Sequence, residues 1–256
     1  MCTLIVLHRC VSKTPLVVAA NRDEFFDRPA EGPALRDTPT GKVLAPRDER
    51  AGGTWLGLNE YGLFAAVTNR RSDAPDPNRR SRGLIVLDAL GSTTAREAAD
   101  EIQRLPHDTY NPFNLVVADG VTAHVFSYLG SPERIDLAPG AHVVGNVHPD
   151  GEDSRKIARL RDEVAQCHDS DRVLDDLADI CRSHAGESPF EPTCVHAGGY
   201  GTRSSTLLRL GKSERDLFYA GGAPCAREYD DFTPLLEELG LGSSRAAGHD
   251  SARKIS

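Results

Sequence analysis

The second residue of the chain is a cysteine, directly behind the initiator methionine. Small residues at this position permit removal of Met1, and Cys2 would then carry both a thiol and a free α-amine. A free α-amine has a pKa of about 7.7–8.0 and a cysteine thiol one of about 8.5. One residue would thus hold a nucleophile and its base together. On position alone, however, a cysteine at the edge of a strand is the plainer interpretation.

Four polar residues follow the apolar run 16–20, at the point where a buried strand would emerge from a sheet: Asn21, Arg22, Asp23 and Glu24. An arginine beside a thiol lowers the pKa of that thiol and favours the thiolate. An aspartate can hold an α-amine by hydrogen bonding. A solvated strand end explains Asn21 and Glu24 equally well.

Three more polar residues stand at the boundaries of apolar runs. Asn69 and Asn146 each follow one, and the carboxamide NH2 of an asparagine is a suitable donor to the oxyanion of a tetrahedral intermediate. Turn chemistry explains each asparagine separately. Arg203 precedes an apolar run, where it is either a solvated cation or a fixed guanidinium near the nucleophile or a substrate carboxylate.

A metal centre is not expected. Cys181, His184, Cys194 and His196 can be written as C-x2-H-x9-C-x-H, which is no standard ligand spacing. A cysteine and a histidine three residues apart on one helix are more typical of a helix face or a core. The chain also lacks a glycine-rich phosphate loop followed by lysine and a helix.

The elements that must position these residues follow from the apolar pattern. Residues 2–10 and 14–21 predict two strands, and 54–58 with 63–68 predict a hairpin around the turn 59–62. The proline-bearing segment 25–46 predicts an irregular loop. Further strands are expected at 113–118, 122–128, 142–145, 204–210 and 217–220, and helices after Ser81 and over 94–104, 153–167 and 171–184.

This order of strands and helices predicts a layered α+β domain over residues 2–239, with a disordered tail over 240–256. The net charge of -8 argues against a nucleic-acid partner. Six irregularly spaced cysteines favour a reducing cytosol. We expect a soluble cytoplasmic protein, because there is no basic leader and the apolar runs are too short to span a membrane.

Four stretches together resemble the NRDE proteins, the relatives of the transport and Golgi organisation 2 protein. They are MCT at 1–3, NRDE at 21–24, GGTWLGLNEYGLFAAVTN at 52–69 and SRG at 81–83. The resemblance implies the fold of the N-terminal-nucleophile hydrolases, a four-layer αββα sandwich with two mostly antiparallel sheets. A more distant resemblance connects the chain with the choloylglycine hydrolases and penicillin V acylases, which also begin Met-Cys-Thr.

The acylase resemblance implies a role for each polar residue. Cys2 would be the nucleophile, Asp23 would orient it, and Asn69 would donate to the oxyanion. Asn146 would lie near the α-amine, and Arg203 would support the thiolate. We also expect Asn21, Arg22 and Trp55, which lie in the matching stretches, to bind the substrate.

One departure from the acylases concerns arginine. They place an Arg three residues before the Asp, where this chain has Ala20. The nearby Arg22 would point to the opposite face of an alternating strand from Asp23, and without a bulge it would not reach Cys2.

The two resemblances imply two functions. The first is hydrolysis of a non-peptide amide through an acyl-thioester on Cys2, with no cofactor. The alternative is a non-enzymatic protein that binds or moves haem or a lipid in the same pocket. Both predict a small-molecule ligand and leave its identity and the oligomeric state open.

Overall fold

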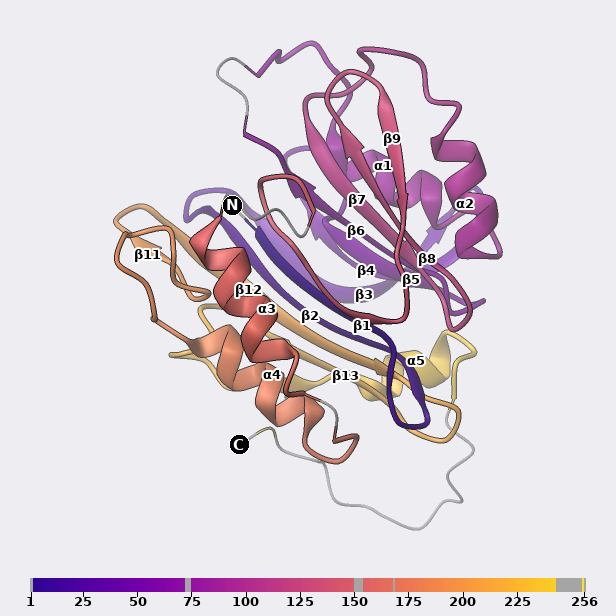
Figure 1. Cartoon of the computed structure of the whole chain (residues 1–256). Coiled ribbons are helices and arrows are strands. Elements are labelled where there is room, and N and C mark those ends of the chain that lie inside the picture. Colours follow the sequence, from indigo (N-terminus) through magenta and orange to yellow (C-terminus); the bar gives the residue numbers. More distant parts are fainter. Residues whose placement is uncertain (1, 72–74, 150–153, 168, 243–254, 256) are drawn as a thin grey trace.

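Two antiparallel sheets stack face to face in this chain (Figure 1), whose computed structural model describes residues 2–71, 75–149, 154–167, 169–242 and 255. The first sheet has the strand order β10-β1-β2-β12-β13-β14, with β11 paired to β12. Its strands are β1 (Cys2–Val11), β2 (Thr14–Phe25), β10 (Gly140–Val144), β11 (His196–Ala197), β12 (Tyr200–Leu210), β13 (Arg215–Ala220) and β14 (Asp230–Asp231).

The second sheet runs in sequence order from β3 to β9, so each of its strands pairs with the next one along the chain. Its strands are β3 (Ala30–Thr38), β4 (Gly41–Asp48), β5 (Leu56–Asn59), β6 (Phe64–Asn69), β7 (Phe113–Ala118), β8 (Ala123–Tyr128) and β9 (Pro132–Asp136).

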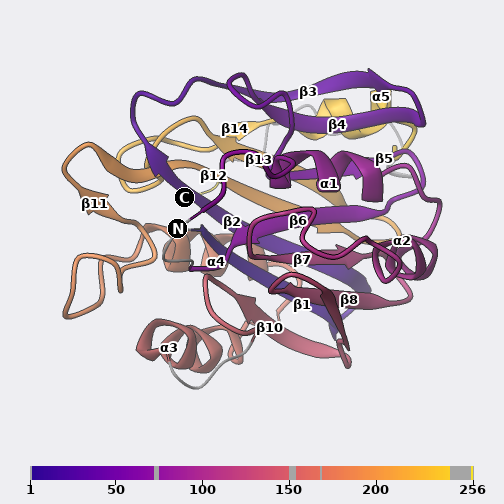
Figure 2. The ribbon, with the colours of Figure 1, turned by 90° about the horizontal axis from the view of Figure 1, so that it is seen from above.

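Helices cover the outer face of each sheet. Helices α3 (Arg155–Val164) and α4 (Val173–Arg182) pack on the first sheet, and α1 (Arg82–Ala89) and α2 (Ala95–Ile102) pack on the second. Figure 2 shows the layers from above, with α3 and α4 on the side of the molecule away from α1 and α2. The αββα sandwich implied by the sequence is therefore confirmed.

Side chains along β1 and β2 point alternately to the two faces of the first sheet, so they contribute to two separate apolar cores. Leu4, Val6 and Val18 face the second sheet, while Ile5 and Val17 face α3 and α4. Because both faces of these strands are buried, they read in the sequence as continuous apolar runs, which is why they were predictable.

The prediction of an irregular loop over 25–46 is wrong, because β3 and β4 occupy most of it. The prolines fit without breaking the ladder: Pro33 lies in a register shift of β3, and Pro39 lies in the turn between the strands. Strand β3 is also an edge strand, where proline is tolerated.

The C-terminal region differs from the predicted tail where it can be described. Helix α5 (Thr233–Glu238) precedes Leu241, which is buried between the sheets, and Ile255 is buried in the apolar cluster that includes residues of α3 and α4. The rest of the predicted tail, 243–254 and 256, lies outside the described residues. Among the helices that the structure describes, none has the length and apolar character needed to cross a bilayer.

Two glycines fix the start of α1 against the segment that precedes the strand β5. A Cβ atom on Gly53 would lie 2.4 Å from the carbonyl carbon of Gly83, so the two backbones touch only because neither residue has a side chain. The amide of Thr54 donates to the carbonyl of Gly83 at 3.1 Å. This contact sets the position of Arg82, the first residue of α1.

Replacing Gly53 by alanine should therefore lower the free energy of unfolding by about 1–3 kcal/mol, because the added methyl group forces the two backbones apart. Urea unfolding measures the change. The matched control is Gly199→Ala, where a Cβ meets nothing within 4 Å, and its effect should stay within about 0.5 kcal/mol. Equal effects of the two variants would contradict the close approach.

A candidate active site at one end of the sandwich

The antiparallel pairing of β1 and β2 places Cys2 directly opposite Arg22. Residues that are directly opposite in an antiparallel pair point to the same face of the sheet. Cys2 and Arg22 thus share the face turned toward the second sheet, and Asp23 alternates to the face that α3 covers. The prediction that Arg22 and Asp23 point to opposite faces holds, but the conclusion that Arg22 would not reach Cys2 is wrong, because Cys2 lies on the face of Arg22.

Cys2 lies between two cavities. The larger, of about 560 Å³, is bordered by Cys2, Asn146, Lys156 and Phe190 among others. The smaller, of about 100 Å³, is bordered by Cys2, Arg22, Asp23, Trp55, Asn69 and Arg82 among others. The larger volume falls in the range typical of small-molecule sites.

Asn146 connects the ends of three strands. Its Oδ1 accepts a hydrogen bond from the main-chain nitrogen of Cys2 at 3.3 Å, and its Nδ2 donates to the carbonyl of Asn69. Asn146 follows β10 and Asn69 ends β6, so this one carboxamide connects the two sheets beside the thiol.

The loop that carries Asn146 is held by two polar residues of the second sheet. The Thr68 hydroxyl donates to the carbonyl of Gly145 at 2.6 Å. The carboxamide of Asn114 donates to the carbonyls of Gly145 and Val147, at 3.0 and 2.7 Å. Asn114 is completely buried, and these two bonds satisfy the donors of its Nδ2 group.

Asp23 is buried on the helix-covered side and takes part in a polar network. The Thr202 hydroxyl donates to its Oδ1 at 2.6 Å, and the Tyr200 hydroxyl donates to its main-chain carbonyl at 2.9 Å. Burial raises the pKa of the Asp23 carboxyl to about 6, against the opposing charge of Lys156. Burial in turn lowers the pKa of the Lys156 ammonium.

Opposing effects act on the pKa of the Cys2 thiol. Burial raises its pKa, and the negative charge of Asp23 adds to this effect. The guanidinium of Arg22 and a backbone hydrogen bond from Asp23 favour the thiolate. Because burial is the largest effect, the thiol stays protonated at neutral pH until a base takes its proton.

Arg22 is only 5% exposed and is held in place by an aromatic ring. Its guanidinium lies 4.2 Å from the ring centre of Trp55, and it pairs with Glu24 at 3.9 Å. A cation over an indole face is a favourable contact that also restricts the arginine side chain. Arg22 and Trp55 together form one wall of the smaller cavity.

Two of the residues singled out in the sequence have other contacts. The carboxamide of Asn21 donates to the carbonyls of Cys181 and Thr193, each at 2.9 Å, on the side of the sheet away from Arg22. Arg203 occupies a register shift of β12 between Thr202 and Ser204, and its guanidinium lies 5.9 Å from the ring centre of Phe26. Arg203 borders neither of the two cavities described above.

Several residues at or near the site were not predicted from the sequence. Arg82 borders the smaller cavity, donates to the carbonyl of Pro112 at 3.1 Å, and has its pKa lowered by burial. Lys156 borders the larger cavity. Two of them had a visible signal: Arg82 lies in the matching stretch SRG, and Asn114 lies inside the apolar run 113–118, where asparagine is unfavourable in a strand.

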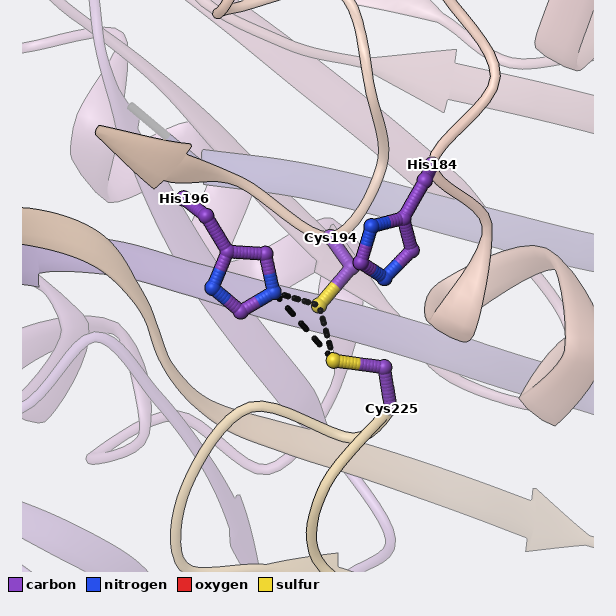
Figure 3. Close-up of side chains that lie close together, drawn as sticks. All are labelled: His184, Cys194, His196 and Cys225. Carbon is purple, nitrogen blue, oxygen red and sulfur yellow. Dashed lines mark hydrogen bonds between the residues drawn. The ribbon is translucent and has the colours of Figure 1, made fainter.

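Of the four residues considered as metal ligands in the sequence, three lie together in the structure and one does not. Cys181 is buried in α4, whereas His184, Cys194 and His196 gather with Cys225 (Figure 3). This cluster lies outside the set of residues that border the two cavities at Cys2.

Comparison with solved structures defines the class of the fold. The chain is similar to the Caenorhabditis elegans N-acylethanolamine-hydrolyzing acid amidase (NAAA) ortholog, with a TM-score of 0.58 and 13% identity over 94% of this chain and 97% of that one. It is also similar to the C2A mutant of the conjugated bile acid hydrolase from Clostridium perfringens, with a TM-score of 0.52 and 13% identity over 100% of both chains. The fold is that of the N-terminal-nucleophile hydrolases.

The family follows from sequence. Residues 1–220 match the family model described as Transport and Golgi organisation 2. The Transport and Golgi organization protein 2 homolog of Homo sapiens is 30% identical over 238 residues, which cover 78% of this chain and 84% of that protein. The homolog of Mus musculus is 27% identical over 237 residues with the same coverage. The chain belongs to the transport and Golgi organisation 2 family, as the NRDE resemblance indicated.

The raised pKa of Asp23 predicts a dependence of stability on pH. Its pKa of about 6 in the folded chain exceeds the usual value of 3.8, so the folded state binds this proton more tightly than the unfolded state. The contribution is complete below about pH 4 and is lost as the pH rises to about 6. It amounts to about 2–3 kcal/mol.

Urea unfolding of the native protein and of Asp23→Asn at pH 4 and pH 7 measures this effect. The variant keeps an oxygen that accepts from Thr202 but does not titrate. It should gain stability relative to the native protein as the pH rises. Identical pH slopes for the two proteins would show that Asp23 titrates normally.

Proposed function

We propose that the chain hydrolyses a non-peptide amide through an acyl-thioester on Cys2, after removal of Met1. The hydrogen bond from the Cys2 nitrogen to Asn146 carries the proposal. Once Met1 is removed, that nitrogen is the α-amine, and Asn146 holds it at a residue that borders both cavities.

The α-amine would serve as the base. With a pKa of about 7.7–8.0, an α-amine is partly unprotonated at neutral pH, and Asn146 Oδ1 accepts from it and fixes its orientation. The amine takes the proton of the Cys2 thiol as the sulfur attacks the substrate carbonyl. The proton then passes to the leaving amine, which departs and leaves the acyl group on sulfur.

Water completes the cycle. It attacks the thioester, the α-amine accepts its proton, and the released thiol recovers a proton as the carboxylic acid leaves. Arg22 favours the thiolate as the leaving group in this step, because it faces the same side of the sheet as Cys2. Overall, one amide and one water give one acid and one amine.

Asn69 is the candidate donor to the oxyanion. Its main-chain carbonyl accepts from Asn146 Nδ2, which anchors the end of β6 beside Cys2. Its side chain borders the smaller cavity together with Cys2. The carboxamide of a residue whose backbone is anchored beside the nucleophile can donate to the negative oxygen of a tetrahedral intermediate.

The similar structures support this reaction class. One is described as an amidase that hydrolyses N-acylethanolamines, and the other as a hydrolase of conjugated bile acids. Both descriptions name small molecules, in keeping with a cavity of about 560 Å³. Binding of haem or a lipid in the same cavity stays a prediction of the sequence.

Acylation by p-nitrophenyl acetate tests the nucleophile. Intact mass should show that Met1 is absent and that a brief incubation adds one acetyl group, which peptide mapping places on Cys2. Cys2→Ala should lose this label, because no other thiol has an α-amine on the same residue.

Cys10→Ala is the matched control, since Cys10 is also half-buried and lies on the same strand. It should be labelled as fast as the native protein. Equal labelling of native protein and Cys2→Ala, or retention of Met1 on the mature chain, would rule out the proposed nucleophile.

Replacing Asn69 by alanine tests the oxyanion donor. Loss of one such donor lowers kcat by about 10²–10³-fold, and KM should change much less because the contact forms in the transition state. Steady-state hydrolysis of the same ester measures both constants. Asn78→Ala, at an exposed asparagine, should leave both unchanged, and a loss confined to KM would assign Asn69 to substrate binding.

A further inference from the structure

Four sulfur and nitrogen ligands converge at one end of the first sheet, apart from the two cavities. His184 follows α4, Cys194 precedes β11, His196 begins β11, and Cys225 lies between β13 and β14. Each offers one ligand atom, and these four atoms lie within 4.8 Å of one another. Figure 3 shows the two imidazoles on either side of the Cys194 sulfur, with the Cys225 sulfur facing it.

Three distances within the cluster are close to those of a tetrahedral zinc site. Zinc binds thiolate sulfur at about 2.3 Å and imidazole nitrogen at about 2.0–2.1 Å. A tetrahedron with these bonds has sulfur atoms about 3.8 Å apart and sulfur–nitrogen pairs about 3.6 Å apart. The two sulfurs here are 3.5 Å apart, and His196 Nε2 lies 3.6 Å from the Cys194 sulfur and 3.2 Å from that of Cys225.

We propose that His184, Cys194, His196 and Cys225 bind one Zn²⁺ ion. Two thiolates and two imidazoles are the tetrahedral S₂N₂ set that zinc prefers. Two thiolates also balance the charge of the ion, and binding releases both thiol protons to water. Three of the four residues are exposed, so the ion can enter from solvent, while the fourth, Cys194, is buried.

The histidines favour a metal ion over a disulfide. A disulfide between Cys194 and Cys225 needs sulfurs about 2.05 Å apart. It would not explain why two imidazoles lie beside the sulfurs. Here the rings of His184 and His196 stack with centroids 5.1 Å apart, at the same place as the two sulfurs. A single ion accounts for all four side chains.

The proposed ion would hold together three segments: the end of α4, the strand β11 with the residues before it, and the loop between β13 and β14. The Cys194 amide donates to the carbonyl of Ser183 at 3.0 Å. Next to Cys194, the amide of Val195 donates to the Thr202 hydroxyl at 2.8 Å, and this hydroxyl donates to Asp23. With four protein ligands, the site is closed and structural in character.

Zinc titration of the reduced, chelator-treated protein tests the proposal. Competition with a chromophoric chelator should show one Zn²⁺ bound per chain. Cys225→Ser should weaken binding more than about 100-fold, because loss of a mere outer-shell partner already costs 10–100-fold. Cys225 is exposed, so this variant should fold, and circular dichroism checks it.

Two further measurements make the result specific. Cobalt in place of zinc should give the visible bands of a tetrahedral ion and a thiolate charge-transfer band, both lost in Cys225→Ser and weakened in His184→Ala. Cys10→Ser, at a cysteine outside the cluster, should bind zinc as the native protein does.

Absence of zinc binding by the fully reduced protein would overturn the proposal. So would equal zinc affinity of Cys225→Ser and the native protein, because the ion would then lie elsewhere. A Cys194–Cys225 disulfide in the isolated protein that, once reduced, yields no zinc-binding form would replace the metal site with a redox pair.

Discussion

The register between β1 and β2 is the constraint on which the candidate site depends. Each strand is buried on both faces, by the second sheet on one side and by α3 and α4 on the other. A slip of one residue would exchange the two faces. The apolar side chains thus fix the pairing of Cys2 with Arg22, and with it the separation of Arg22, which lies between the sheets, from Asp23, which lies under α3.

The second sheet supplies what the first lacks at this end. A lone hairpin of β1 and β2 would leave the Cys2 nitrogen and the turn after β10 without fixed partners. Asn146 accepts from the Cys2 nitrogen within the first sheet. The bonds that cross from one sheet to the other are made by Asn146 to Asn69 and by Thr68 and Asn114 to Gly145. The buried Nδ2 group of Asn114 is tolerable only with its hydrogen bonds made, and its two bonds to the carbonyls of Gly145 and Val147 fix the position of this side chain.

The sequence predicts those parts of the site that depend on local pattern. Continuous apolar runs located β1, β2 and β6, and the polar residues at their ends pointed to Cys2, Asp23 and Asn69. The pairing of strands is not local, so the sequence alone could not show that Cys2 shares a face with Arg22, or that Asn21 turns toward the carbonyls of Cys181 and Thr193. Strands β3 and β4 escaped prediction because prolines occur in them at positions outside the regular ladder.

The cluster of sulfur and nitrogen ligands escaped for a similar reason, since Cys225 is 29 residues beyond His196 and joins it only when β12 and β13 pair. The cluster is connected with Asp23 by hydrogen bonds. Thr202 bonds both to Val195, next to Cys194, and to Asp23. Because the same hydroxyl serves both partners, the proposed ion, by immobilising Cys194, would also limit how far Thr202 can move from the Asp23 carboxylate. The acidity of a buried carboxyl depends on its hydrogen bonds, so binding of the proposed ion would influence the charge state of Asp23 through Thr202.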